Sequence, residues 1–190
     1  MAVFTAGSFP PDAFWDYSTR LYAKPVVTTV CLDLQDRCGL DVNVLLFCCW
    51  VAASGRGGFR DGELAAALSA VSEWHGQVAT PVRALRRYLR GNTGQTPRRL
   101  ADDLGRVVAE CEIYAEHVEQ LILSGSLGRP GTGTFDPAEQ ARAAAGNLAA
   151  YFEAATADAE PEDRKAIAEL LKAAFPDAAD WLIRELSGIA

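Results

Sequence analysis

Apolar positions recur at helical spacing along most of the chain, and alternation of apolar and polar residues over several positions is almost absent. In DAFWDYSTRLYAK, the side chains of Phe14, Tyr17 and Leu21 follow an i, i+3, i+7 pattern that predicts an amphipathic helix. Pro25 suits the first turn of a second helix, and Gly39 suits the position just after its end. The pattern predicts an all-α fold, an irregular multi-helix bundle.

The block VNVLLFCCWVAAS is apolar on nearly every side, so we expect it to form a central helix. Asp41 stands just before it and is the expected N-cap. Asp61 is expected to cap a fourth helix, which Gly76 and Pro81 should interrupt. A helix over PVRALRRYLR and a long helix from about 98 to 124 complete the predicted core.

The glycine-rich stretch SGSLGRPGTGTFDP is the clearest predicted linker. It divides the chain into a helical core domain over residues 1–124, a linker over 125–135 and an alanine-rich helical extension over 136–190. Residues 1–135 carry 14 acidic and 13 basic side chains, whereas the remainder carries 11 and 5. The extension is therefore the acidic part, and we expect the two parts to have different roles.

The composition indicates a soluble globular protein of 190 residues, with 49% hydrophobic and 23% charged residues. A net charge of −7 argues against binding to nucleic acid or to an anionic membrane. The first residues contain no basic segment followed by a long apolar run, and the longest apolar block is about half a membrane span. We expect a cytoplasmic protein.

The five cysteines show no C-x-x-C pair and no neighbouring pair of histidines. Cys48 and Cys49 are adjacent on the predicted central helix, so their side chains diverge and cannot hold one ion together. We expect reduced thiols that pack as small hydrophobic groups, and neither a metal site nor a cofactor.

A polar motif of Asp36, Asp41 and Asn43 surrounds the start of the central helix. These residues are interpreted first as helix caps and alternatively as ligands of a small cation. The two histidines, His75 and His117, lack the E-x-x-H and H-E-x-x-H partners of metal-binding helices, so capping or surface roles are expected. No catalytic motif is present.

Arginines dominate the segment from Arg83 to Arg99, which contains no acidic residue. Four of them share one helix stripe: Arg83, Arg86, Arg87 and Arg90. The long helix that follows is strongly acidic, so one interpretation is an antiparallel hairpin in which arginines face carboxylates. The other is a site for an anion or an acidic partner, because guanidinium groups bind carboxylate and phosphate with two hydrogen bonds.

Three motifs resemble an uncharacterised family of small all-helical bacterial proteins, best represented in proteobacteria. They are FWDYSTRLYAKPVV, CLDLQDRCGLDVNVLLFCCWVA and PVRALRRYLR, and a weaker likeness extends to NLAAYF at residues 147–152. The motif positions are Trp15, Tyr17, Leu21, Tyr22, Gln35, Asp36, Gly39, Asp41, Asn43, Trp50, Arg83, Arg86 and Arg87. The resemblance implies a helical fold and assigns no activity.

The leading hypothesis is a non-enzymatic protein–protein interaction module, an adaptor or assembly factor, with a protein partner or a second copy of itself. Trp181, Leu182 and Leu186, with Ile183, are the expected partner anchors. The alternative is a small-molecule or anion-binding protein, or an enzyme, with its site between helices. That site would lie near Asp41, Asn43, Arg83 and Arg86.

The two hypotheses predict different geometry. Convergence of the four site residues on a concave pocket, with arginines free of acidic partners, favours the binding site. If each arginine is paired within the hairpin, the binding-site hypothesis fails.

Overall fold

The computed structural model describes residues 10–91 and 93–188. All regular structure in these ranges is helical, as the sequence predicts. The helices are α1 (Ala13–Tyr22), α2 (Pro25–Cys38), α3 (Val42–Val51), α4 (Glu63–Trp74), α5 (Thr80–Arg90), α6 (Arg98–Gly125), α7 (Pro137–Ala154), α8 (Pro161–Ala174) and α9 (Asp180–Ser187). Two π-helical turns, η1 (Ala52–Arg56) and η2 (His75–Ala79), follow α3 and α4.

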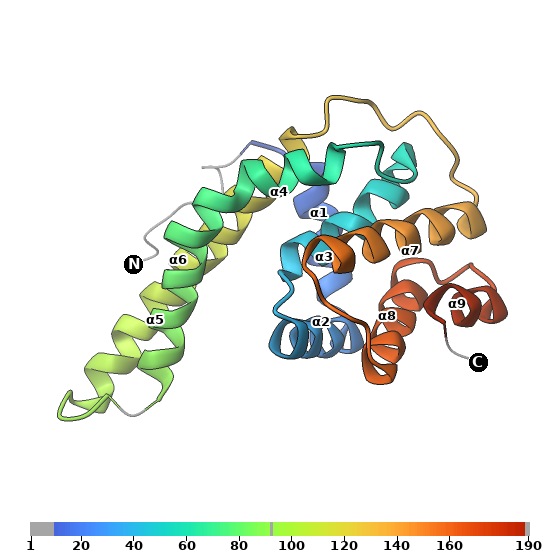
Figure 1. The fold of residues 1–190 in the computed structure, drawn as a ribbon. Helices are drawn as coiled ribbons and strands as arrows, with labels where there is room; N and C mark the ends of the chain where they lie inside the picture. Colours follow the sequence, from blue (N-terminus) through green and yellow to red (C-terminus); the bar gives the residue numbers. More distant parts are fainter. Residues whose placement is uncertain (1–9, 92, 189–190) are drawn as a thin grey trace.

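The helices form a body and a projecting arm (Figure 1). The body contains α1–α3 and α7–α9, and the arm is made by α5 lying antiparallel to α6. With 28 residues, α6 is about 42 Å long and runs from the tip of the arm into the body. Among the described residues, no helix combines the length and the apolar character needed to cross a bilayer.

The central position of α3 explains its uniformly apolar sequence. Every residue from Asn43 to Val51 is buried. Phe47 and Trp50 pack against Phe14 of α1, with ring centroids 5.4 and 5.2 Å from that ring. Asp41 is the N-cap, as predicted, and its carboxylate accepts a hydrogen bond from the backbone N–H of Asn43 at 2.8 Å.

The predicted packing role of the core thiols is confirmed. Cys31, Cys48 and Cys49 have no solvent exposure, and all five cysteines are unpaired. Burial raises the pKa of the Cys31 thiol to about 12, so this thiol stays protonated and unreactive at neutral pH.

The segment from α4 to α5 departs from the prediction in two ways. Gly62, with φ 79°, takes the N-cap position of α4 that was predicted for Asp61. Gly76 and Pro81 do not interrupt the helix, because η2 carries the chain from α4 directly into α5. A π-helical turn widens the helix locally and accommodates the hydrogen bond that proline cannot donate. As a result, α4 and α5 form one bent rod beside α6 (Figure 1).

The acidic C-terminal helices pack on the body. α7 contacts α3, α8 contacts α2, and one continuous hydrophobic core includes residues from both sides of the predicted linker. Asn147 of α7 is 2% exposed, and it donates to the backbone carbonyl of Cys48 and accepts from the N–H of Phe59. These helices therefore lie against α2 and α3 and leave the arginine stripe of α5 uncovered.

The glycine-rich stretch also follows a fixed path. Arg129 forms an ion pair with Glu63 at 2.7 Å, and the N–H of Gly133 donates to the carbonyl of Gly55 at 2.7 Å. A Cβ at Gly131 would lie 1.9 Å from the carbonyl oxygen of Ser54. Glycine is required at this position because two backbone segments meet there.

Replacing Gly131 with alanine is therefore expected to destabilise the protein by about 1–3 kcal/mol, because the added methyl group forces the two backbones apart. Gly128→Ala is the matched control, since nothing lies within 4 Å of its added Cβ, and its effect should stay within about 0.5 kcal/mol. Urea unfolding measures both. Equal stabilities for the two variants would contradict the close approach.

Candidate functional site

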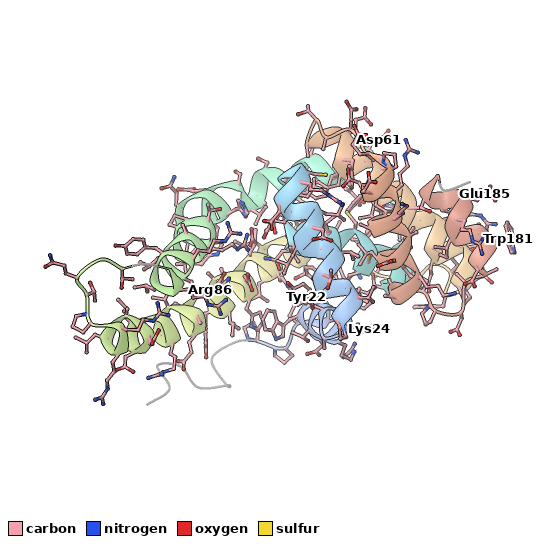
Figure 2. The ribbon with its side chains drawn as sticks, turned by 90° about the horizontal axis from the view of Figure 1, so that it is seen from below. Tyr22, Lys24, Asp61, Arg86, Trp181 and Glu185 are labelled. Atoms are coloured by element: carbon pink, nitrogen blue, oxygen red, sulfur yellow. The ribbon has the colours of Figure 1, made fainter. Side chains whose placement is uncertain are left out.

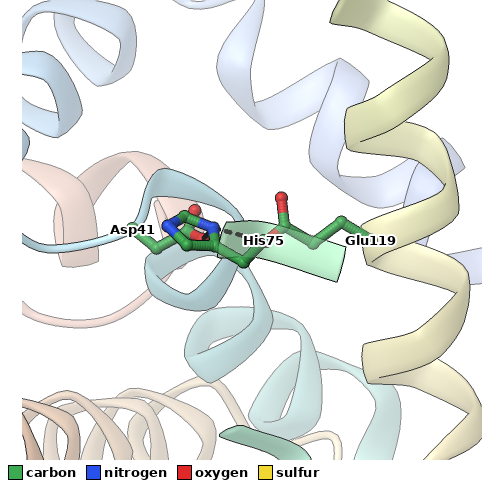
Figure 3. A group of neighbouring side chains, drawn as sticks. All are labelled: Asp41, His75 and Glu119. Carbon is green, nitrogen blue, oxygen red and sulfur yellow. Dashed lines mark hydrogen bonds and ion pairs between the residues drawn. The ribbon is translucent and has the colours of Figure 1, made fainter. Parts of the chain in front are cut away.

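Three side chains from different elements meet at the junction of body and arm (Figure 3). The Nδ1 atom of His75 lies 2.7 Å from Oδ2 of Asp41 and 2.7 Å from Oε1 of Glu119. Glu119 has no solvent exposure and Asp41 is 9% exposed, whereas the His75 side chain is about one third exposed. The three ligand-type atoms all lie within 4.8 Å of one another, so this group has the composition and spacing to hold a metal ion.

Hydrogen bonds extend this cluster into the protein. Asn43 donates from Nδ2 to Oε2 of Glu119 at 2.7 Å, and its Oδ1 accepts from Gln120 at 2.7 Å. Ser18 of α1 donates to Oε1 of Gln120 at 2.6 Å. This chain of buried contacts joins α1, α3 and α6, and it fixes the orientation of the Glu119 carboxylate.

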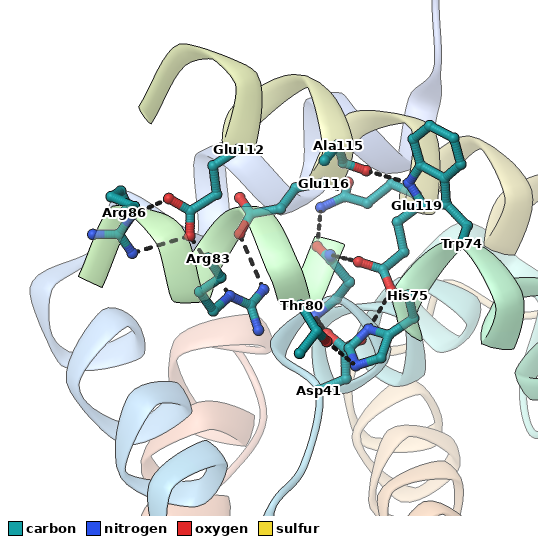
Figure 4. A network of polar contacts seen from close by, with 12 residues as sticks. Asp41, Trp74, His75, Thr80, Arg83, Arg86, Glu112, Ala115, Glu116 and Glu119 are labelled. Carbon is teal, nitrogen blue, oxygen red and sulfur yellow. Dashed lines mark hydrogen bonds and ion pairs between the residues drawn. The ribbon is translucent and has the colours of Figure 1, made fainter. Parts of the chain in front are cut away.

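Local structure explains how each side chain reaches the cluster. Asp41 is held by its capping role and by a hydrogen bond from its backbone N–H to the hydroxyl of Tyr151 at 2.8 Å. His75 opens η2, and its Nε2 atom lies 3.2 Å from the hydroxyl of Thr80 (Figure 4). Glu119 lies on the buried stripe of α6 that also carries Ala115.

The electrostatics follow from this geometry. Hydrogen bonds to Asp41 and Glu119 raise the pKa of His75 to about 10. Burial raises the pKa of Glu119. Burial acts on Asp41 in the same direction, but the hydrogen bond and charge of His75 outweigh it and the pKa of Asp41 is lowered. Near neutral pH, His75 is therefore an imidazolium beside an ionised Asp41.

The arginine stripe divides into paired and exposed members. Arg86 forms an ion pair with Glu112, and Arg83 lies 3.2 Å from Glu116 (Figure 4). The prediction that arginines of the hairpin face carboxylates of the long helix is confirmed for these two. Arg87 and Arg90 are exposed, and the described part of the chain gives neither of them an ion pair.

A pocket of about 430 Å³ opens beside the polar cluster, between α1, α2, α3, α5 and α6. Its apolar wall includes Trp15, Tyr22 and Leu46, and its polar wall includes Asn43 and Gln120. Arg83, Arg86 and Arg87 also line it, together with Glu112 and Glu116. The volume lies within the range of small-molecule sites.

The other predicted site residues lie elsewhere. Asp36 is exposed on α2 and does not join Asp41 and Asn43. Of the three predicted partner anchors, Trp181 is 64% exposed, Leu182 is buried, and Leu186 packs partly against the core. Figure 2 shows Trp181 at the end of the molecule opposite Arg86.

His75 does take the C-cap position of α4, as expected, but the expected surface or capping role is wrong for His117. His75 turns its ring between two carboxylates, and His117 is buried and stacks on Trp15 with ring centroids 4.0 Å apart. Glu119 was not predicted as a site residue, although the sequence holds a signal. Glu112 and Glu119 stand seven residues apart on the stripe of α6 that also carries Val108 and Ala115, where an apolar residue is expected.

The fold and the site define an all-helical protein with a buried carboxylate–histidine cluster beside an inter-helix pocket. The model of the family described as "Protein of unknown function (DUF2390)" matches residues 13–123, so the chain belongs to this family. The match spans α1 to α6 and contains every residue that lines the pocket. Comparison with curated proteins and comparison with solved structures each gave no match.

The cluster predicts a pH-dependent stability. The ordinary pKa of His75 is 6.5 and the folded value is about 10, so its contribution is complete below pH 6.5 and is lost as the pH rises towards 10. The charged groups involved are Asp41 and Glu119, which face the ring from α3 and α6, with Arg83 acting on Asp41. In metal-free buffer, the free energy of unfolding of wild type minus that of His75→Gln should fall between pH 6.5 and 10.

Urea unfolding at several pH values measures this difference. His117→Gln is the control, because burial lowers the pKa of His117 and its effect should be confined to the region near and below pH 6.5. A difference for His75→Gln that stays constant from pH 6 to 10 would show that the ring is not charged in the folded protein.

Proposed function

We propose that the chain is a binding protein for a small organic molecule, which occupies the pocket between the body and the arm. One observation carries the proposal: side chains from four separate stretches of sequence, on α1, α2–α3, α5 and α6, line this single cavity. Trp15 and Tyr22 come from α1, Gln35 and Asn43 from α2 and α3, and Arg87 from α5. Nothing in the local patterns of these stretches requires them to meet, and their convergence supports a shared site.

The lining indicates the chemistry of the ligand. Indole and phenol rings offer flat apolar surface, and the amides of Asn43 and Gln120 offer hydrogen bonds. Arg83 and Arg86 are already paired with carboxylates, which counts against a strongly anionic ligand held by both. Of the three arginines that line the pocket, Arg87 has no ion pair with any described residue, so the proposed ligand combines an aromatic or aliphatic body with one acidic group.

An anionic aromatic dye, anilinonaphthalene sulfonate, provides a direct probe. The protein should bind one equivalent with a rise in dye fluorescence, and Arg87→Ala should weaken binding roughly tenfold, because one charge-assisted contact is lost. Arg90→Ala removes a similar exposed arginine that does not line the pocket and should leave the affinity unchanged. Equal affinity of both variants would contradict the proposed site.

We propose a second function, self-association through the arm, on a separate observation. Six large apolar side chains on α5 and α6 are 40% to 60% exposed, and all but Ile113 belong to one set: Leu85, Tyr88, Leu100, Leu104 and Val107. Helical spacing puts them on the side of the hairpin opposite Arg83 and Arg86. They form what we term the arm stripe, which runs about 20 Å towards the tip of the arm.

The occupant proposed for the arm stripe is a second copy of the chain. Both signs of charge border it on α6, where Arg99 is exposed and Asp103 forms an ion pair with Arg106. A two-fold pairing would bring opposite charges together and close four helices around the apolar residues. This is the interaction role expected from the sequence, placed on the arm instead of on Trp181, Leu182 and Leu186.

Sedimentation velocity tests the pairing. Wild type should form a dimer at tens of micromolar, and Leu104→Asp should be monomeric with an unchanged melting temperature, because this side chain is half exposed. Ile113→Asp is the control, since Ile113 is equally exposed but lines the pocket on the other side of α6. A wild-type monomer at all concentrations would rule out the second copy as occupant.

We also propose that the protein is bacterial and works in the cytoplasm. Five unpaired thiols support a reducing compartment, and the motif resemblance supports the bacterial source.

A further inference from the structure

Three polar atoms of the kind that bind metal ions point at one another at the junction of body and arm. They are Oδ2 of Asp41, Nδ1 of His75 and Oε1 of Glu119 (Figure 3). An imidazolium has one N–H at Nδ1, and a strong hydrogen bond requires that N–H to point at one acceptor. It cannot serve both carboxylates fully, although both oxygens lie at 2.7 Å. The geometry has more converging acceptors than donors.

The surrounding hydrogen bonds leave these atoms directed inwards. Oδ1 of Asp41 accepts from the N–H of Asn43, and Oε2 of Glu119 accepts from the amide of the same residue. In each carboxylate, therefore, one oxygen accepts a hydrogen bond from Asn43 and the other points towards Nδ1 of His75. The Nε2 atom of His75 lies 3.2 Å from the Thr80 hydroxyl, which can accept a hydrogen bond from Nε2–H when Nδ1 is bound to an ion. Outer contacts of this kind orient metal ligands in proteins.

We propose that Asp41, His75 and Glu119 form a binding site for one divalent transition-metal ion of the Mn²⁺, Fe²⁺ or Zn²⁺ type. Two carboxylate oxygens and one imidazole nitrogen suit these ions, whereas Ca²⁺ and Mg²⁺ prefer sites made of oxygen alone. The charges also balance, because two carboxylates and a neutral imidazole present −2 to the ion. The one-third exposure of His75 leaves a side through which ion and water can enter.

The site is built from three elements that the fold holds independently. Asp41 is set by the start of α3, His75 by η2, and Glu119 by α6. Asn43 donates to Glu119 and also lines the pocket, so the ion would lie one side chain away from the proposed ligand. The metal site does not depend on the pocket, and either can be present without the other.

Mn²⁺ titration of the chelator-treated full chain tests the proposal. Electron paramagnetic resonance of free Mn²⁺ should reveal one bound ion per chain, and electron spin-echo modulation should show coupling to one imidazole nitrogen. Glu119→Gln keeps the shape of the side chain and removes its charge, and it should weaken Mn²⁺ binding at least tenfold. His117→Gln removes the only other histidine and should leave stoichiometry, affinity and nitrogen coupling unchanged.

Circular dichroism establishes that each variant is folded. If Glu119→Gln does not fold, His75→Gln replaces it, because that side chain is partly exposed and its loss should abolish the nitrogen coupling. The proposal is overturned if neither Mn²⁺ nor Zn²⁺ binds saturably to wild type. It is equally overturned if the folded cluster variant binds as tightly as wild type, or if the bound ion shows no nitrogen coupling.

Discussion

The structure depends on one constraint: the carboxylate of Glu119 has no contact with water, so the protein itself must supply its hydrogen bonds and a balancing charge. Glu119 stands on the buried side of α6, and an ionised group there is strongly unfavourable unless charges and hydrogen bonds surround it. Its partners are His75 and Asn43, which come from two other helical segments. The requirement to satisfy one side chain thus fixes how the rod of α4 and α5 meets α3 and α6. Arm, pocket and polar cluster all take their positions from that meeting.

The C-terminal helices contribute to this arrangement although the family match ends at residue 123. Tyr151 of α7 accepts a hydrogen bond from the N–H of Asp41, and Asn147 ties α7 to the carbonyl of Cys48. The start and the middle of α3 are therefore held by a segment outside the matched range. In this chain the acidic extension packs against α3 and so stabilises the position of Asp41. It lies on the side of the body away from the arm (Figure 1).

Much of the fold could be predicted from the sequence, because its signals are local. Proline at Pro25, glycine at Gly39 and the capping carboxylate of Asp41 each mark a helix boundary through their own backbone chemistry. The continuity of α4 and α5 could not be predicted, since a π-helical turn depends on packing against α6. Only part of the site could be predicted from the sequence, namely the arginines and Asp41. His75 and Glu119 are 44 residues apart and meet only through tertiary structure.

The π-helical turn that carries His75 also sets the rotation of everything beyond it. Each residue of an α-helix turns the chain by about 100°, so removing one residue from His75–Ala79 would swing the following helix through that angle. Arg83 would then leave Glu116 and the pocket together. This short turn therefore sets the rotation of α5 in the arm relative to the polar cluster. The residue count of this turn therefore determines both where the His75 ring lies and which face α5 presents to α6.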